Sequence, residues 1–263
     1  GPSHAEWGGR HELDTIYCAV GVYDTVTATR KAPGSGFSLN LEGAYLGDLA
    51  SSGSDMRRNH AVLALFAMAE ASGHEPDVAL NIDKRIPVGA GMAGGSTDAA
   101  AVLRALNVLT GANFSAEQLR VLALTVGSDV PYCVTGGMML AEGRGEILSP
   151  LPELPGGWIV MCKPPFSVST AELFGRIDKR RITAHPDTQG LCAALHAGDL
   201  CGVARRMFNV FEEALPRSGA EIGSIRGALL DGGALGAVMT GTGSAVFGVF
   251  DDRAAAAAAN DSL

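Results

Sequence analysis

The chain has 263 residues, of which 47% are hydrophobic and 18% are charged, as is typical of a soluble globular enzyme with one large domain or two modest ones. The formal net charge of −8 and the lack of a dense basic patch exclude a binder of nucleic-acid polymers, although backbone N–H groups can still hold a nucleotide. No apolar run approaches the ~18 residues of a membrane span, and the first residues, GPSHAEWGGRHEL, lack the pattern of a signal segment. The five cysteines form no C-x-x-C pair. We therefore expect a cytoplasmic protein with reduced thiols.

The first 87 residues combine several strand-like stretches with one helical stretch. The expected strands are residues 13–29, folded around a turn at Tyr23–Asp24, then 37–43, and 78–87, ended by Pro87. A polar loop over residues 47–58 leads into a helix over residues 59–73, which ends at Gly73.

A glycine-rich stretch follows, RIPVGAGMAGGSTDAAAVLRALN at residues 85–107. From Gly89 it satisfies G-x-G-x-x-G, but Pro87 separates the glycines from the strand and no acid ends a strand about 20 residues further on, which disfavours a dinucleotide-binding Rossmann loop. A Walker A loop is excluded because Gly95 stands where that motif needs lysine.

The remaining interpretation is a loop that wraps phosphates at the N-terminus of its own helix. Ser96, Thr97 and Asp98 are suitable N-cap residues, and free N–H groups with a partial charge of about +0.5 would form an anion site there. A surface turn ahead of a helix is the alternative, but a turn needs only one or two glycines. The backbone can approach an anion closely, with positive φ, at four glycines: Gly89, Gly91, Gly94 and Gly95.

The rest of the chain alternates between helix and strand signals. Helical spacing of apolar residues continues through Ala99, Val102, Leu103, Leu106 and Leu109. A further helix opens at Ser115 with an S-x-x-Q capping box and ends at Gly127. PLPELPGG at 150–157 is the only plausible linker, which splits the fold near residue 150. Beyond it we expect a strand over Trp158–Cys162, two or three helices, a strand pair over 233–250 and a helix over 254–259.

Five segments of the chain resemble the motifs of one family. PVGAGMAGGSTDAA (87–100) fits the second motif of the GHMP kinases, P-x-x-x-G-(L/M)-(G/A)-(G/S)-S-(S/T)-(D/A)-A, throughout. The others are similar to motifs of those members that phosphorylate a cytidine-diphosphate-linked methylerythritol: GGRHELDTI (8–16), VGSDVPYCVTGG (126–137), FSVSTAELF (166–174) and TGTGSAVFG (240–248). The resemblance implies an α+β two-domain GHMP kinase fold, with a ribosomal-protein-S5-like N-terminal domain over residues 1–150 and a ferredoxin-like C-terminal domain over 151–263.

The resemblance also implies a reaction and its site. The chain would be an ATP- and Mg²⁺-dependent kinase that phosphorylates the 2-hydroxyl of that substrate, a step of non-mevalonate isoprenoid (terpenoid) biosynthesis. Asp129 would be the catalytic acid–base residue. The substrate would lie against His11, Phe174, Gly241, Thr242 and Gly243. ATP would be bound by Asn59, near the adenine, and by Pro87, Val88, Gly89, Ala90, Gly91, Met92, Ala93, Gly94, Gly95, Ser96 and Thr97.

Asp129 suits this role on its own chemistry as well. It lies between a helix end and Val130–Pro131, which predicts an extended backbone. Its neighbours are apolar, and a carboxylate in such surroundings can orient an alcohol and accept its proton. An Asp that only caps a turn is the alternative.

The other assignments also have structural alternatives. His11 could pack beside Trp7, Phe174 could belong to the core, and the glycines of residues 240–248 would also serve a plain hairpin turn. Ser96 could ligate magnesium through its hydroxyl, but no second metal carboxylate is evident, so the metal ligands stay open.

The sequence departs from the family pattern near its start. The family's first motif, P-x-K-(I/V)-N-L, is absent, and with it the lysine that pairs with the aspartate; Lys84 cannot be assumed to replace it. Arg10 stands where tyrosine is usual, which weakens the case for stacking on the cytosine. Because phosphoryl transfer depends on positive charge around the transferred group, we expect weak or no activity from this stretch of chain.

Three other functions remain to be distinguished from this kinase. One is another GHMP kinase, such as a homoserine or mevalonate kinase, which the GGRHEL and SDVPYCV segments disfavour. The second is a nucleotide-binding protein of the same fold without catalysis, and the third, more distant, is a nicotinamide-dependent oxidoreductase.

Overall fold

The computed structural model describes residues 3–7, 9–47, 56–180, 182–216 and 219–263. The chain divides into two compact units after Pro150, except that residues 89–92 group with the second unit. The first unit therefore holds residues 1–88 and 93–150, and the second holds 89–92 and 151–263. The predicted polar loop over residues 47–58 falls mostly on residues 48–55, which lie outside the described residues.

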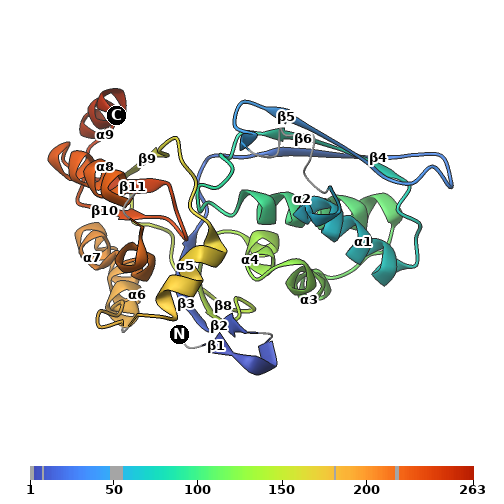
Figure 1. Ribbon diagram of the computed structural model, residues 1–263, viewed down its shortest axis with the longest axis horizontal. Coiled ribbons are helices and arrows are strands. Elements are labelled where there is room, and N and C mark those ends of the chain that lie inside the picture. The colour runs from blue at the N-terminus through green and yellow to red at the C-terminus, as the bar shows by residue number, and fades with distance from the viewer. Residues whose placement is uncertain (1–2, 8, 48–55, 181, 217–218) are drawn as a thin grey trace. The chain divides into compact units, whose positions relative to one another are not determined.

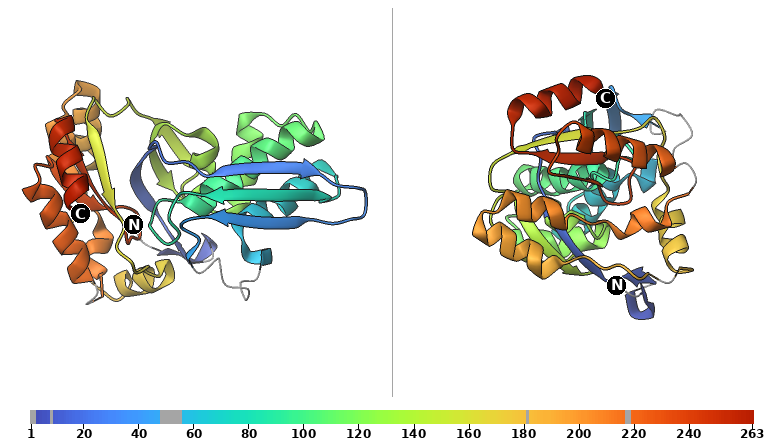
Figure 2. Two further views of the ribbon diagram at one scale, coloured as in Figure 1. Left: turned by 90° about the horizontal axis from the view of Figure 1, so that it is seen from above. Right: turned by 90° about the vertical axis from the view of Figure 1, so that its left-hand side faces the viewer.

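The first unit contains a three-stranded sheet of order β4-β6-β5, in which β4 is antiparallel and β5 parallel to the central strand (Figure 2, left). Side chains of β6 alternate, so that Val78, Leu80 and Ile82 are buried on one face. Helices α1 and α2 cover that face, and α3 and α4 extend the layer (Figure 1). The elements are β4 (Thr25–Arg30), β5 (Ser38–Gly43), η3 (Met56–Arg58), α1 (His60–Ser72), β6 (Val78–Lys84), α2 (Gly94–Thr110), α3 (Ala116–Val126) and α4 (Val130–Thr135).

A second sheet of the first unit has the order β3-β7-β8 and is antiparallel throughout. It consists of β3 (Leu13–Cys18), β7 (Met138–Gly143) and β8 (Ile147–Pro150). Residues 13–29 do form two strands, as predicted, but β3 and β4 belong to different sheets and do not pair around Tyr23–Asp24. A short ribbon of β1 (Ser3–His4) and β2 (Arg10–His11) around η1 (Ala5–Trp7) precedes them.

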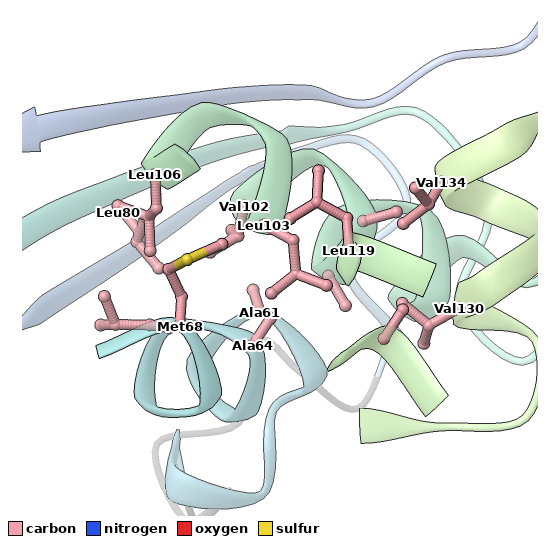
Figure 3. Packing of buried hydrophobic residues seen from close by; sticks show 14 of the residues in the cluster. Ala61, Ala64, Met68, Leu80, Val102, Leu103, Leu106, Leu119, Val130 and Val134 are labelled. Carbon is pink, nitrogen blue, oxygen red and sulfur yellow. The ribbon is translucent and has the colours of Figure 1, made fainter. Parts of the chain in front are cut away.

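Helix ends in the first unit follow the chemistry of their residues. The helix predicted over residues 59–73 is confirmed as α1, with Asn59 accepting from the Ala61 N–H at its start and Gly73 left-handed at its end. The capping box is confirmed at Ser115. The core beneath the β4-β6-β5 sheet is built by residues from all four helices and β6 (Figure 3). Figure 3 labels Ala61, Ala64, Met68, Leu80, Val102, Leu103, Leu106, Leu119, Val130 and Val134.

The second unit is a three-stranded antiparallel sheet of order β10-β11-β9, on which α8 and α9 pack. The predicted strand Trp158–Cys162 and the predicted strand pair within 233–250 are confirmed. The prediction of two or three helices between them was too low, because the described residues form four α-helices there. The elements are β9 (Trp158–Cys162), α5 (Thr170–Ile177), α6 (Thr188–Ala197), α7 (Leu200–Arg206), η4 (Val210–Ala214), α8 (Ala220–Asp231), β10 (Gly236–Met239), β11 (Val246–Phe250) and α9 (Arg253–Ser262).

The alanine run near the C-terminus forms α9, as predicted, and buries Ala256 and Ala259 against the sheet. Among the described residues, no helix is both long and apolar enough to cross a membrane. The five cysteines all lie in the described residues, and none of them forms a disulfide bond.

Candidate active site

The glycine-rich stretch leaves β6 at Lys84 and enters α2 at Gly94. The helix begins earlier than Ser96, Thr97 and Asp98 would allow as N-caps, so that prediction was wrong. Ala93 takes the N-cap position with φ 54°, and its carbonyl accepts from the N–H groups of both Ser96 and Thr97, at 2.9 Å each. The left-handed turn at Ala93 starts the helix without help from a side chain.

The N-terminus of α2 has the character of an anion site. Among the described residues, no hydrogen bond is recorded for the N–H groups of Gly94 and Gly95, and Gly95 is exposed. The Ser96 hydroxyl likewise makes no recorded hydrogen bond within the described structure, whereas the Thr97 hydroxyl donates to the Gly94 carbonyl at 2.8 Å. A helix of 17 residues directs its partial positive charge to this end.

The residues before the helix belong to both units. Val88 follows Pro87 and donates its N–H to the Tyr45 carbonyl in the first unit. In the second unit, the segment from Gly89 to Met92 is paired with the segment after β10: the Ser244 N–H donates to the Gly89 carbonyl at 3.2 Å, and the Ala245 N–H donates to the Ala90 carbonyl at 3.1 Å. Two separate sequence motifs therefore meet through their backbones.

Glycines make this close approach possible. Gly91 has φ +74°, and a Cβ there would overlap the Thr240 carbonyl oxygen and lie 2.7 Å from the Gly243 nitrogen. A Cβ on Gly241 would lie 2.7 Å from the Gly91 carbonyl oxygen. Since ordinary Cβ contacts exceed 3 Å, only glycine fits at either position. The Thr240 hydroxyl adds a further hydrogen bond between the two segments by donating to the Gly91 carbonyl at 3.2 Å.

The same loop also contacts the V-S-T segment. The hydroxyls of Thr242 and Thr170 lie 2.9 Å apart, and the Ser244 hydroxyl donates to the Phe166 carbonyl at 2.6 Å. Phe174 lies on α5 beyond this contact and packs edge-on against Phe211, with ring centroids 5.0 Å apart. Phe174 therefore has a packing role, and it remains half-buried rather than enclosed.

Asp129 stands at the start of α4, but its carboxylate makes no capping hydrogen bond. Oδ1 instead accepts a hydrogen bond of 2.6 Å from the Tyr17 hydroxyl on β3. The expected extended backbone was wrong, because Val130 and Pro131 form the first turn of α4. Proline is tolerated there since its missing N–H would have no partner within the helix.

His60 is a neighbour of the site that the sequence did not single out. A Cβ on Gly95 would lie 3.5 Å from its Nδ1, and a Cβ on Gly127 would lie 3.9 Å from its Cε1. The imidazole therefore lies between the start of α2 and the turn that leads to Asp129. Its position directly after Asn59, which the resemblance had placed near the adenine, was the only available signal.

A buried charge cluster lies beneath the glycine-rich stretch. The Lys84 ammonium contacts the carboxylates of Asp24 and Asp98, the latter at 2.7 Å, and Lys84 is only 2% exposed. Asp24 also accepts from the N–H groups of Arg85 and Ile86 at 2.6 and 2.8 Å. Those bonds turn the chain out of β6 at Lys84, short of the predicted strand end at Pro87.

The two carboxylates of this cluster have different protonation properties. Burial raises the pKa of Asp98 to about 6 even though Lys84 opposes the shift, and its Oδ1 is buried without a hydrogen-bond partner in the described structure. Burial would also raise the pKa of Asp24, but the Ile86 N–H, Lys84 and the Arg85 N–H together lower it. With its ammonium held by both carboxylates, Lys84 has a structural role here.

Two residues that the resemblance places at the cytidine side of the site, Arg10 and His11, form the short strand β2. His11 ends β2 and pairs with Ser3, and Trp7 stacks on His4 with ring centroids 4.1 Å apart. The side chain of Arg10 lies outside the described part of the structure.

Comparison with known proteins follows the same division of the chain. Residues 59–137, from the N-cap of α1 to the residue before β7, match the GHMP kinases N terminal domain, and residues 191–263 match the GHMP kinases C terminal domain. The chain belongs to the GHMP kinase family. It is therefore a kinase that transfers phosphate to an alcohol, and the family uses ATP.

Several relatives of this GHMP kinase share the name 4-diphosphocytidyl-2-C-methyl-D-erythritol kinase. That of Bifidobacterium adolescentis is 59% identical over 223 residues, which are 75% of this chain and 72% of the relative. That of Bifidobacterium longum subsp. infantis is 50% identical over 260 residues, 97% of this chain and 78% of the relative. A crystal structure of 4-(cytidine 5'-diphospho)-2C-methyl-D-erythritol kinase is 30% identical with a TM-score of 0.75, and covers 97% of this chain and 87% of that one.

Proposed function

We propose that this GHMP kinase transfers the γ-phosphoryl group of MgATP to the 2-hydroxyl of 4-diphosphocytidyl-2-C-methyl-D-erythritol, a step of non-mevalonate isoprenoid biosynthesis. The observation that carries the proposal is the 50% identity over 97% of the chain to a relative named for that substrate. The geometry around Asp129 and the start of α2 supports it independently of the name.

Asp129 is the proposed acid–base residue. The substrate hydroxyl oxygen forms a bond to the γ-phosphorus while the bond from that phosphorus to the β–γ bridging oxygen breaks. The hydroxyl proton passes to the Asp129 carboxylate, and ADP leaves with the bridging oxygen. Since Oδ1 already accepts from Tyr17, Oδ2 is the oxygen that takes the proton.

Residues 87–97 are proposed to hold the phosphates of ATP. The N–H groups of Gly94 and Gly95 lie at the positive end of α2, where an anion is stabilised. Asn59 is proposed to lie near the adenine. Its neighbour His60 lies close to Gly95, in the first turn of α2, where the phosphates are proposed to bind.

Magnesium is proposed to arrive with ATP as part of the substrate. No three His, Cys, Asp or Glu side chains cluster as a metal site in the part of the chain that is described, and Mg²⁺ is commonly held by substrate phosphates with only one or two protein groups. The hydroxyl of Ser96, at the start of α2, is the proposed protein group.

The acceptor is proposed to contact His11, Phe174 and the loop from Gly241 to Gly243. The loop is held in place by Asn209, whose amide donates to the Met239 and Gly241 carbonyls at 2.7 Å each. Gly241 at the tip of this fixed loop is exposed and Thr242 is half-buried, so the loop can orient a polar acceptor, which contributes to rate by positioning.

The test is ADP formation from MgATP and the cytidine-linked substrate, measured for this chain, for a chain extended at its N-terminus by the family's P-x-K-(I/V)-N-L strand, and for Asp129→Asn of each. We expect turnover that falls about 10²- to 10⁴-fold in the Asp129→Asn variants. Silence of both parent chains with retained ATP binding would instead favour a nucleotide-binding protein without this catalysis.

A further inference from the structure

Tyr17 contacts the proposed catalytic carboxylate from a different element. It lies on β3, paired with Met139 of β7, and its hydroxyl donates to Oδ1 of Asp129 at 2.6 Å across 112 positions of sequence. An aspartate at the start of a helix ordinarily accepts from the helix's own N–H groups. Asp129 makes no such bond, so Tyr17 is the group that fixes its side chain.

The position of Tyr17 is itself fixed by packing. Its ring stacks on Tyr132 of α4, with centroids 4.5 Å apart and planes 22° apart. Tyr132 is buried, and its hydroxyl donates to the Gly137 carbonyl at 2.9 Å. Because Asp129 and Tyr132 are three residues apart on one helical face, a single tyrosine holds the first turn of α4 at two points.

The hydrogen bond between Tyr17 and Asp129 has a defined direction. Burial first, and then the charge and hydrogen bond of Asp129, raise the pKa of Tyr17 well above its ordinary value. The phenol therefore stays protonated and can only donate to the carboxylate. Oδ1 is thereby occupied, while no bond to Oδ2 is recorded among the described residues, and Asp129 is not fully buried.

We propose that Tyr17 is the positioning residue for Asp129: it holds Oδ1 so that Oδ2 is presented to the hydroxyl that is phosphorylated. The inference rests on the proposed function, since it assigns a role in that reaction. Tyr17 exchanges no proton with substrate, and its contribution is to confine the carboxylate to one orientation, which is a known source of rate.

The experiment compares Tyr17→Phe with Tyr132→Phe, measured in whichever parent chain turns over. Each variant removes one hydroxyl from one ring of the stacked pair, but only Tyr17→Phe removes a donor to Asp129. We expect Tyr17→Phe to lower kcat about 10- to 100-fold, as for a hydrogen bond to a charged group, with little change in the KM for either substrate. Tyr132→Phe should lower the melting temperature and leave kcat within about twofold.

Equal kcat values for the two variants, or a change in KM alone, would overturn the positioning role. A stability cycle provides a second readout: the loss in melting temperature caused by Tyr17→Phe should shrink in an Asp129→Ala background, and additive losses would contradict the contact. If both parent chains are silent, the proposed function fails and the positioning role falls with it. An active parent that is insensitive to Tyr17→Phe refutes only the inference about Tyr17.

Discussion

Replacing Gly91 by alanine tests the close backbone contact between the glycine-rich stretch and the loop after β10. Alanine at φ +74° costs about 1–2 kcal/mol for the left-handed backbone. Its Cβ would overlap the Thr240 carbonyl oxygen and lie 2.7 Å from the Gly243 nitrogen, and overpacking of this kind adds about 1–3 kcal/mol. Both contacts are with backbone, which cannot rotate away as a side chain could.

We therefore expect Gly91→Ala to lower the free energy of unfolding by about 2–5 kcal/mol, measured by denaturant titration. Because the clash moves the backbone ahead of α2, kcat/KM for ATP should fall about 100-fold, the effect of a displacement near 1 Å. Gly223→Ala on α8 is the control, since a Cβ there meets nothing within 4 Å and the backbone has no positive φ.

The reasoning would be refuted by a Gly91→Ala protein with the stability and ATP kinetics of Gly223→Ala. Such a result would mean that the two segments are not in contact in solution. Loss of stability with unchanged ATP kinetics would keep the contact and remove its role in nucleotide binding.

Three further predictions concern charges and caps in the first unit. Burial raises the pKa of Asp98 in the folded protein to about 6, above the value in the unfolded chain. The free energy of unfolding should therefore fall by as much as about 3 kcal/mol as the pH rises from 4 through 6. Asp98→Asn should flatten this pH dependence of unfolding, and an unchanged slope would contradict the assignment. Lys84→Met should cost about 3–5 kcal/mol at pH 7, because it leaves two carboxylates buried without their cation, and a neutral result in thermal unfolding would show that the cluster is hydrated. Asn59→Ala and Ser115→Ala should each cost about 1 kcal/mol as lost caps, but only Asn59→Ala should raise the KM for ATP; equal KM values would remove Asn59 from the adenine site.

Elements with strong local signals could be predicted from the sequence. The helix between Asn59 and Gly73 has both caps in its own residues, and the helix that opens at Ser115 carries a reciprocal capping box. The strand Trp158–Cys162 is a short continuous apolar run, and it forms β9, an edge strand of the β10-β11-β9 sheet. In each case the residues that decide the structure are neighbours in sequence.

Short elements held by distant partners could not be predicted in this way. Strands β7 and β8 have six and four residues and are fixed by pairing with β3 and with each other. The helix α4 contains a proline that suggested extended chain, and packing of Val130 and Val134 into the core outweighs that preference. The early start of α2 at Gly94 depends on a left-handed alanine, which no propensity favours.

Contacts within the candidate active site were also beyond prediction, because they join residues that are far apart in sequence. The glycine pattern indicated a phosphate loop, but nothing in it showed that Gly91 lies against Thr240 and Gly243. Asp129 was found through its motif. Tyr17, whose hydroxyl donates to that carboxylate, carries no signal in sequence because the two residues are 112 positions apart and only the fold brings β3 to the start of α4. Lys84 stood out only by its nearness to the loop, and its buried partners came from the fold.

The central claim is tested most directly by identifying the product of phosphoryl transfer. The active parent chain is incubated with MgATP and an equimolar mixture of the cytidine-linked methylerythritol, homoserine and mevalonate, and the products are resolved by ³¹P NMR and mass spectrometry. The account predicts a new phosphomonoester on the 2-hydroxyl of the cytidine-linked substrate alone, lost in Asp129→Asn. Phosphorylation of homoserine or mevalonate in preference to it, or an Asp129→Asn protein of undiminished rate, would contradict the account.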